Sequence, residues 1–322
     1  MTLITTTDEL KTANSAVVHD LNFESVQSFV EDASIRDLIP AIGRTTYVLI
    51  GVGGDASGLA IAAQLAKKCE ANLAIAYYVN FGSVKLSENG AQVYQDGNNR
   101  IASDRKITAL CNQSRLDGYR SLDALLEYLE TDRETFTAYH ESLERKARLN
   151  GFLNTTADFN EALYINENPL LFRSLRSYIR DAETEHIIPI LGDEYAETLK
   201  ANILARNCSD VEKLLQRHIA KAVAQFAIAE AIPYRAISFD ANGIFTNTVG
   251  ASADGGNVEK QAAGETKRLT MAMSTALAAG NKHLDRLRKF ISKNKDALTG
   301  INEVKLNTRS TLNDEPRGFF FA

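Results

Sequence analysis

Apolar residues recur at three- and four-residue spacing in the second half of the chain, which predicts an amphipathic helix. The stripe consists of Phe172, Leu175, Tyr178, Ile179, Ala182 and His186. The segment ends in Ile-Pro-Ile-Leu-Gly at residues 188–192, where proline disfavours a continuing helix and glycine permits a left-handed stop. We therefore expect one helix that ends near Gly192.

The same pattern stands earlier in the chain. Residues 23–43 align with residues 172–192 without a gap and share eight of twenty-one residues. Further matches follow in the same order, pairing residues 5–8 with 155–158, 74–76 with 227–229, 89–90 with 242–243, and 118–129 with 280–291. Such self-similarity indicates a repeat architecture, and we interpret it as a tandem duplication.

Each copy continues with the same predicted elements. Alanine-rich apolar segments at about 57–79 and 209–232 predict long helices suited to close helix packing. Alternating residues then flank Asn89-Gly90 and Asn242-Gly243, which predicts β-hairpins near 83–95 and 235–247. A further helical region closes each copy.

The fold class predicted is therefore mainly α: a tandem duplication of a helical module, each copy with a small β-hairpin, plus an extended C-terminal tail. The expected domains are 1–150, 151–295 and a tail at 296–322. The tail ends in Phe319, Phe320 and Phe321, and burial of each ring would contribute about 1.5–3 kcal/mol. We expect this tail to dock either on its own domain or on a neighbour.

Composition excludes several classes of protein. The 322 residues, 44% hydrophobic and 24% charged, fit about two ordinary globular domains and exclude a disordered or collagen-like chain. No apolar run approaches the ~20 residues of a membrane span, and the first residues lack a secretory pattern. Three widely separated cysteines, Cys69, Cys111 and Cys208, predict buried thiols in a reducing cytosol.

The charge balance bears on nucleic acid binding. The chain has 36 basic and 41 acidic residues, a formal net charge of −5. Proteins that bind DNA over a wide surface usually present a basic face, so this balance disfavours that role, although a local basic patch stays open.

A glycine-rich stretch from Gly51 to Gly58 has the layout of a dinucleotide-binding turn, because an apolar run precedes it and a helix follows. Three observations favour a simple turn instead. The equivalent residues 193–200 are helical in pattern, the chain around Glu70 is still in the helix where an acid-tipped strand is needed, and no strand–helix alternation follows. A nucleotide-dependent enzyme using Gly51–Gly58 is the alternative interpretation.

The other polar residues form no recognisable constellation. The five histidines lack metal-ligand spacing, and we expect His186 and His218 to be partly buried structural residues. Glu183 and Glu185 are ordinary for a charge-rich helix face. Because the copies share packing residues and not reactive ones, we expect no enzyme activity, no cofactor and no metal.

The repeated signature resembles an uncharacterised family of Bacteroidetes genomes, their prophages and crAss-like tailed phages. The second copy carries it best, in Phe172, Leu175, Tyr178, Ile179, Ala182, Glu183, Ile187, Ile188, Pro189, Leu191, Gly192 and Tyr195. The first copy keeps Thr6, Asp8, Leu10, Phe23, Ala33, Ile39, Pro40, Gly43 and Tyr47, and departs at Ser34 and at the 51–58 loop. The plan is similar to head–tail connector (adaptor) proteins, which form rings beneath the portal.

This resemblance implies a structural virion protein of the neck or tail junction, present in the host cytoplasm during assembly. The implied partners are other copies of the chain in a twelve-fold ring, the portal, further neck or tail proteins, and double-stranded DNA that passes without sequence-specific binding; no membrane is implied. Candidate contact residues are Asn89, Gly90, Asn242, Gly243, the 246–257 loop and Phe319–Phe321. A cytosolic phage assembly scaffold or chaperone is a further alternative.

Deletion of residues 316–322 is expected to weaken association with a partner more than it lowers the melting temperature, because the exposed phenylalanines would then gain their burial in the complex. Pull-down and thermal unfolding of the truncated chain measure both. A sharp fall in melting temperature with assembly intact would instead assign the tail to internal packing.

Overall fold

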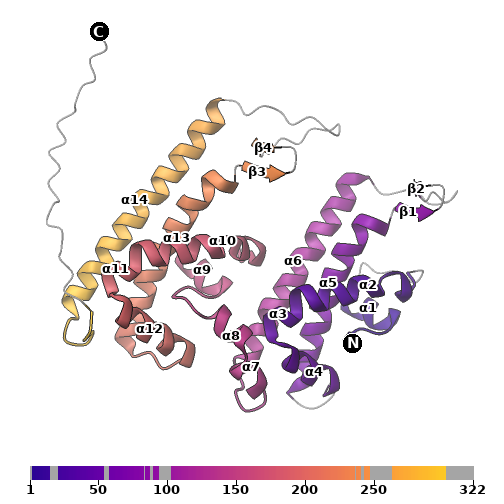
Figure 1. Cartoon of the computed structure of the whole chain (residues 1–322), viewed down its shortest axis with the longest axis horizontal. Helices are drawn as coiled ribbons and strands as arrows, with labels where there is room; N and C mark the ends of the chain where they lie inside the picture. Colours follow the sequence, from indigo (N-terminus) through magenta and orange to yellow (C-terminus); the bar gives the residue numbers. More distant parts are fainter. Residues whose placement is uncertain are drawn as a thin grey trace, which may run out of the picture. The chain divides into compact units, whose positions relative to one another are not determined.

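The computed structural model describes residues 2–14, 21–53, 58–82, 84–87, 90–93, 103–235, 237–240, 243–246 and 263–301. In these residues the fold is mainly α, as predicted (Figure 1). The chain divides into two compact units, Met1–Arg176 and Ser177–Ala322.

The first unit opens with short helices: α1 (Thr7–Ala13), η1 (Phe23–Ser25), α2 (Gln27–Ala33), η2 (Ser34–Leu38), α3 (Ile39–Ile42) and α4 (Arg44–Val52). Its centre consists of α5 (Leu59–Gly82), β1 (Val84–Ser87), β2 (Gly90–Val93) and α6 (Asp104–Leu129). It closes with α7 (Thr137–Glu141), α8 (Leu143–Arg148) and α9 (Thr156–Ala162), after which α10 (Pro169–Ala182) crosses into the second unit.

The second unit presents the same order of elements after α10. It contains η3 (Glu183–Ile187), α11 (Ile188–Leu191), α12 (Asp193–Ala205), α13 (Asp210–Arg235), β3 (Ile237–Asp240), β4 (Gly243–Thr246) and α14 (Ala263–Lys293). Thr6 and Thr155 occupy matching N-caps of α1 and α9, each accepting a hydrogen bond from a first-turn backbone N–H.

The two segments predicted as single amphipathic helices each contain a π-helical turn, which the sequence pattern did not reveal. The turns are η2 and η3, and they stand directly before Pro40 and Pro189. Proline has no N–H and its ring would clash with the carbonyl four residues earlier. The π turn moves the hydrogen bond to the fifth residue, so that Ile39 N–H donates to the Ser34 carbonyl and Ile188 N–H to that of Glu183.

A glycine stops each of these helical segments, as predicted, but with a different backbone conformation. Gly43 has φ 81° and ψ 148°, and Gly192 has φ 81° and ψ 149°. The positive φ requires glycine, while the extended ψ is not that of a left-handed helix. Each glycine therefore redirects the chain straight into the next helix, α4 or α12.

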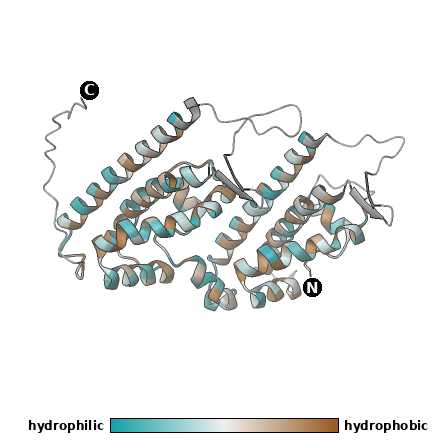
Figure 2. Cartoon of the chain, turned by 45° about the horizontal axis from the view of Figure 1, so that its top comes forward, coloured by the Kyte–Doolittle hydropathy of each residue, from teal (hydrophilic) through white to brown (hydrophobic). Residues whose placement is uncertain are grey.

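Two pairs of long helices organise the units. Helix α5 packs along α6 in the first unit, and α13 packs along α14 in the second (Figure 1). Glycine permits close approach within each pair, because a Cβ on Gly118 would lie 2.7 Å from Leu73 Cγ, and one on Gly280 2.8 Å from Phe226 Cε1. The hydropathy colouring of Figure 2 shows apolar and polar residues sharing the same helices. None of the helices in the described part of the chain combines the length and apolarity that a membrane span needs.

Each long-helix pair is joined by a segment that contains two antiparallel strands. In the first unit Ser87 pairs with Gly90 and Val84 with Val93, and in the second Asp240 pairs with Gly243 and Ile237 with Thr246. Asn89, Asn242, residues 247–257 and Phe319–Phe321 lie outside the described residues.

The division between the units falls between Arg176 and Ser177, whereas the sequence repeat places it between residues 150 and 151. Contacts to the first unit explain the difference. Thr156 Oγ1 donates to Asp123 Oδ2 at 2.6 Å, and the Arg173 guanidinium lies 4.5 Å from the centre of the Tyr119 ring. Helix α9 and the first half of α10 therefore pack with the first unit.

The three cysteines are free thiols. Cys69 and Cys111 are buried, which confirms the prediction for these two, whereas Cys208 is partly exposed. The Cys111 thiol donates to the Ala76 carbonyl at 3.3 Å, and burial raises the pKa of Cys69 well above its ordinary value.

Substitution of Gly118 or Gly280 by alanine is expected to lower the free energy of unfolding by about 1–2 kcal/mol, because overpacking outweighs the better helix propensity of alanine. Gly51→Ala is the matched control, since its added Cβ meets only the flexible end of Leu3, at 3.1 Å. Urea unfolding of the three variants measures the effect. Equal free energies of unfolding for all three variants would show that the close approach of the long helices does not contribute to stability.

Candidate functional site

The π turns place polar side chains against the long helices. In the first unit Asp37 is buried at the end of η2 and accepts two hydrogen bonds from tyrosines. Tyr77 Oη donates to Oδ2 at 2.6 Å, and Tyr119 Oη donates to Oδ1 at 2.6 Å. Burial, followed by the bond to Asp37, raises the pKa of Tyr119 to about 12. Arg36 lies over the Tyr77 ring, 5.6 Å from its centre. The carboxylate is therefore enclosed by donors from α5 and α6.

A second buried carboxylate, Glu70 of α5, joins the start of the chain to the rest of the first unit. Its side chain accepts hydrogen bonds from the backbone N–H of Leu3 at 3.0 Å and Ile4 at 2.9 Å, and from Tyr47 Oη at 2.7 Å. The Ser34 hydroxyl donates to it as well. Burial raises the pKa of Glu70, and these hydrogen bonds oppose that rise. Because its oxygens receive several hydrogen bonds, this buried carboxylate acts as a structural anchor for the first residues of the chain.

A cavity of about 280 Å³ lies beside this anchor. Leu3, Ile35, Ile39 and Val48 contribute an apolar lining. Its polar lining consists of Ser34 and Tyr47, which donate to Glu70, together with Thr2, Glu31 and Arg44. The lining is therefore mixed, and the cavity favours no single class of ligand.

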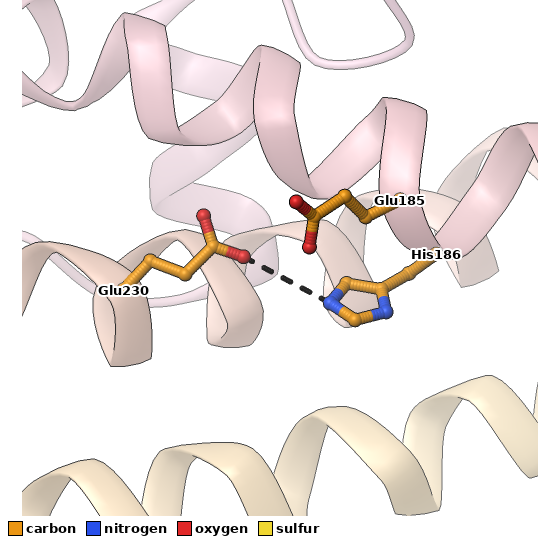
Figure 3. Close-up of side chains that lie close together, drawn as sticks. All are labelled: Glu185, His186 and Glu230. Carbon is orange, nitrogen blue, oxygen red and sulfur yellow. Dashed lines mark ion pairs between the residues drawn. The ribbon is translucent and has the colours of Figure 1, made fainter.

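In the second unit the corresponding turn forms a different cluster, drawn in Figure 3. Glu185 and His186 come from η3, and Glu230 comes from α13. His186 Nε2 lies 3.8 Å from Glu230 Oε1. One ligand atom from each of the three residues lies within 4.8 Å of the others, and among the described residues this is the grouping that could hold a metal ion. The His186 ring stacks on Phe226, with the ring centres 3.9 Å apart.

The electrostatics of this cluster disfavour a strong ion pair. Burial, then the charges of Glu185 and Asp181, raise the pKa of Glu230 to about 7, while burial lowers the pKa of His186. Near neutral pH both shifts favour the uncharged forms, despite the 3.8 Å separation. An uncharged imidazole keeps a lone pair that can bind a cation.

Aligned positions of the two units carry different polar side chains. The alignment places Arg36, Asp37 and Tyr77 at the positions of Glu185, His186 and Glu230. Packing partners keep their geometry: Phe29 stacks on Phe81 with centres 5.9 Å apart and 27° between planes, and Tyr178 stacks on Tyr234 at 6.0 Å and 27°. The polar residues at these aligned positions therefore differ, although the helices that hold them are alike in both units.

The residues singled out in the sequence are not brought together into one site. Gly90 and Gly243 begin β2 and β4. His218 is partly buried, as predicted, and its ring lies 4.9 Å from that of Phe290. The apolar run before the glycine loop lies in α4, which continues through Gly51. A dinucleotide turn needs a strand there, so the geometry of the Gly51–Gly58 alternative is not present.

The sequence pattern did not reveal Glu230 and Glu70 as partners of the π turns. Both stand on long helices more than thirty residues from the π-turn side chains His186 and Ser34, so no local spacing connects them. The one usable signal was a proline inside an amphipathic pattern with polar residues three to six positions before it, as in Glu183 and His186 before Pro189.

Substitution of Glu230 by glutamine is expected to stabilise the protein relative to wild type as pH rises. A folded-state pKa of about 7, against 4.5 in the unfolded chain, means that folding favours the protonated acid. That stabilisation is complete below pH 4.5 and is lost as pH rises through 7. Urea unfolding of both proteins in EDTA between about pH 5 and about pH 8 measures how their difference in stability changes with pH. The glutamine variant lacks this pH-dependent contribution because its side chain does not titrate.

Glu185→Gln serves as a second check on the same acid. Removing this charge lowers the pKa of Glu230, so the loss of stability should begin at lower pH. A wild-type-to-E230Q difference that stays constant with pH would contradict the raised pKa.

One of the three comparisons with known proteins finds a match. The model of a family of unknown function, DUF6712, matches residues 52–149 and 187–307, about two thirds of the chain. No curated protein and no solved structure matches. Each matched segment contains a pair of long helices with its two strands. The chain therefore belongs to the DUF6712 family of unknown function.

Proposed function

We propose that this protein is a structural virion protein: a ring-forming head–tail connector, or adaptor, between the portal and tail of a tailed phage. The observation that carries the proposal is the pair of two-stranded sheets. In the described part of the chain each sheet consists of two strands, so the outer edge of each strand has no paired strand. An isolated hairpin is marginally stable, and a strand from a neighbouring copy would stabilise it.

Repetition within the chain supports an assembly role. We infer that the two units arose by tandem duplication, since the N-caps, the π turns, the glycine stops and the stacked rings recur in the same order. At three aligned positions, two in the turns and one on the long helices, the polar side chains differ. When the packing residues are kept and the polar side chains are replaced, the pattern is typical of a protein selected for its shape. A ring needs such shape, because one face of each copy must fit a different face of the next.

The net charge of −5 is compatible with a channel for DNA. A lumen of negative or mixed charge repels phosphates, so that double-stranded DNA passes without sticking and without sequence-specific binding. The portal and other neck or tail proteins are the proposed partners. The proposed location is the virion neck, after assembly in the host cytoplasm.

Replacement of residues 84–93 and 237–246 by Gly/Ser linkers of equal length is expected to abolish ring formation while the helices stay folded. The open strand edges would be lost, whereas the long helix pairs keep their own packing. Mass photometry and negative-stain microscopy, with the portal protein of the same phage added, measure assembly. Far-UV circular dichroism and melting temperature check the fold.

Single-hairpin variants provide the matched controls and show which unit carries the contact. Rings of unchanged size from the double replacement would exclude the sheet edges as the interface. A wild-type chain that stays monomeric and ignores the portal would overturn the connector proposal. Absence of the chain from purified virions by mass spectrometry would point to an assembly scaffold or chaperone instead.

A further inference from the structure

The cluster on η3 and α13 has the ligand types of a transition-metal site. Glu185 and Glu230 supply carboxylate oxygens, and His186 supplies an imidazole nitrogen. Zn²⁺ binds this mixture of oxygen and nitrogen ligands, each at about 2.0–2.2 Å. Two ligands at that distance in a tetrahedral arrangement lie about 3.4 Å apart. The observed 3.8 Å between His186 Nε2 and Glu230 Oε1 is close to this value.

The imidazole is held in place before any ion binds. Its ring stacks on Phe226, which is only 1% exposed and therefore fixed in the core of the second unit. Glu230 and His186 are about a quarter to a third exposed, with side-chain values of 26% and 30%. Glu185 is exposed. An ion from solvent can thus reach the cluster, and the flexible Glu185 side chain can close around it.

The first unit shows how the same positions are satisfied without an ion. There Arg36 stands at the position of Glu185, and the Asp37 carboxylate receives hydrogen bonds from Tyr77 and Tyr119. The second unit has replaced the arginine by an acid and the tyrosine by another acid. Asp181 adds a third negative charge that acts on Glu230. A divalent cation would supply the positive charge that Arg36 supplies in the first unit.

We propose that the second unit binds one divalent transition-metal ion, Zn²⁺ above all, through Glu185, His186 and Glu230. Nitrogen and oxygen ligands together favour ions such as Zn²⁺ over Mg²⁺ or Ca²⁺, which prefer oxygen alone. Water completes the coordination. The ion would join the π turn to α13 and so stabilise the second unit, independently of the connector role.

The full-length protein, stripped with EDTA and dialysed, is titrated with ZnCl₂ by calorimetry and with CoCl₂ by visible absorption. One ion per chain is expected, together with the intense visible bands of low-coordinate Co²⁺ and a higher melting temperature with Zn²⁺. His186→Ala and Glu230→Gln should each weaken Zn²⁺ binding by at least about 10- to 100-fold, because even outer-shell partners have effects of that size.

His283→Ala is the matched control. His283 belongs to α14 of the same unit, but burial, then the charges of Arg286, Lys221 and Lys282, lower its pKa, and these charges repel cations. This variant should bind Zn²⁺ like wild type. Glu185→Gln changes an exposed side chain and keeps the test valid if His186→Ala fails to fold.

Three results would overturn the proposal. The first is a wild-type chain without saturable Zn²⁺ binding. The second is wild-type affinity in both Glu185→Gln and Glu230→Gln. The third is a stoichiometry of half an ion per chain, which would indicate bridging between copies.

Discussion

A proline inside a continuous helical segment is the constraint on which the polar interior of both units depends. Pro40 and Pro189 have no N–H to donate to the helical hydrogen-bond ladder, and the π turns η2 and η3 accommodate this loss. Ser34 and Asp37 lie in η2 and Glu183 lies in η3, and all three are buried. These buried polar residues therefore belong to the turns that precede the prolines.

The buried polar side chains are hydrogen-bonded differently in the two units. The first closes its contacts internally, through Glu70 bound by two backbone N–H groups and Asp37 bound by two tyrosines. In the second, valine stands at the aligned position of Glu70, and the buried acid Glu183 belongs to the π turn instead. The first unit thus buries acids on both α5 and η2, whereas the second buries Glu183 on η3.

The sequence patterns predicted those features that depend on residues close together in the chain. The stripe that contains Leu175 and Ile179 is buried, and Gly43 and Gly192 stop their helices, because periodicity and a positive φ depend on neighbouring residues. Tertiary contacts decided the rest. The pairing of His186 with Glu230 and the unit division within α10 both depend on segments far apart in sequence. No single-sequence pattern encodes such contacts.

The cysteines give the first unit a chemical reporter of its opening and the second unit a thiol that is accessible in the folded state. Cys69 lies in α5 with no exposed surface, so its thiol meets solvent only when the surrounding helices separate. Cys208 stands just before α13 and is partly exposed in the folded state. Thiol modification at Cys69 therefore follows the opening of the first unit, while Cys208 is modified without it.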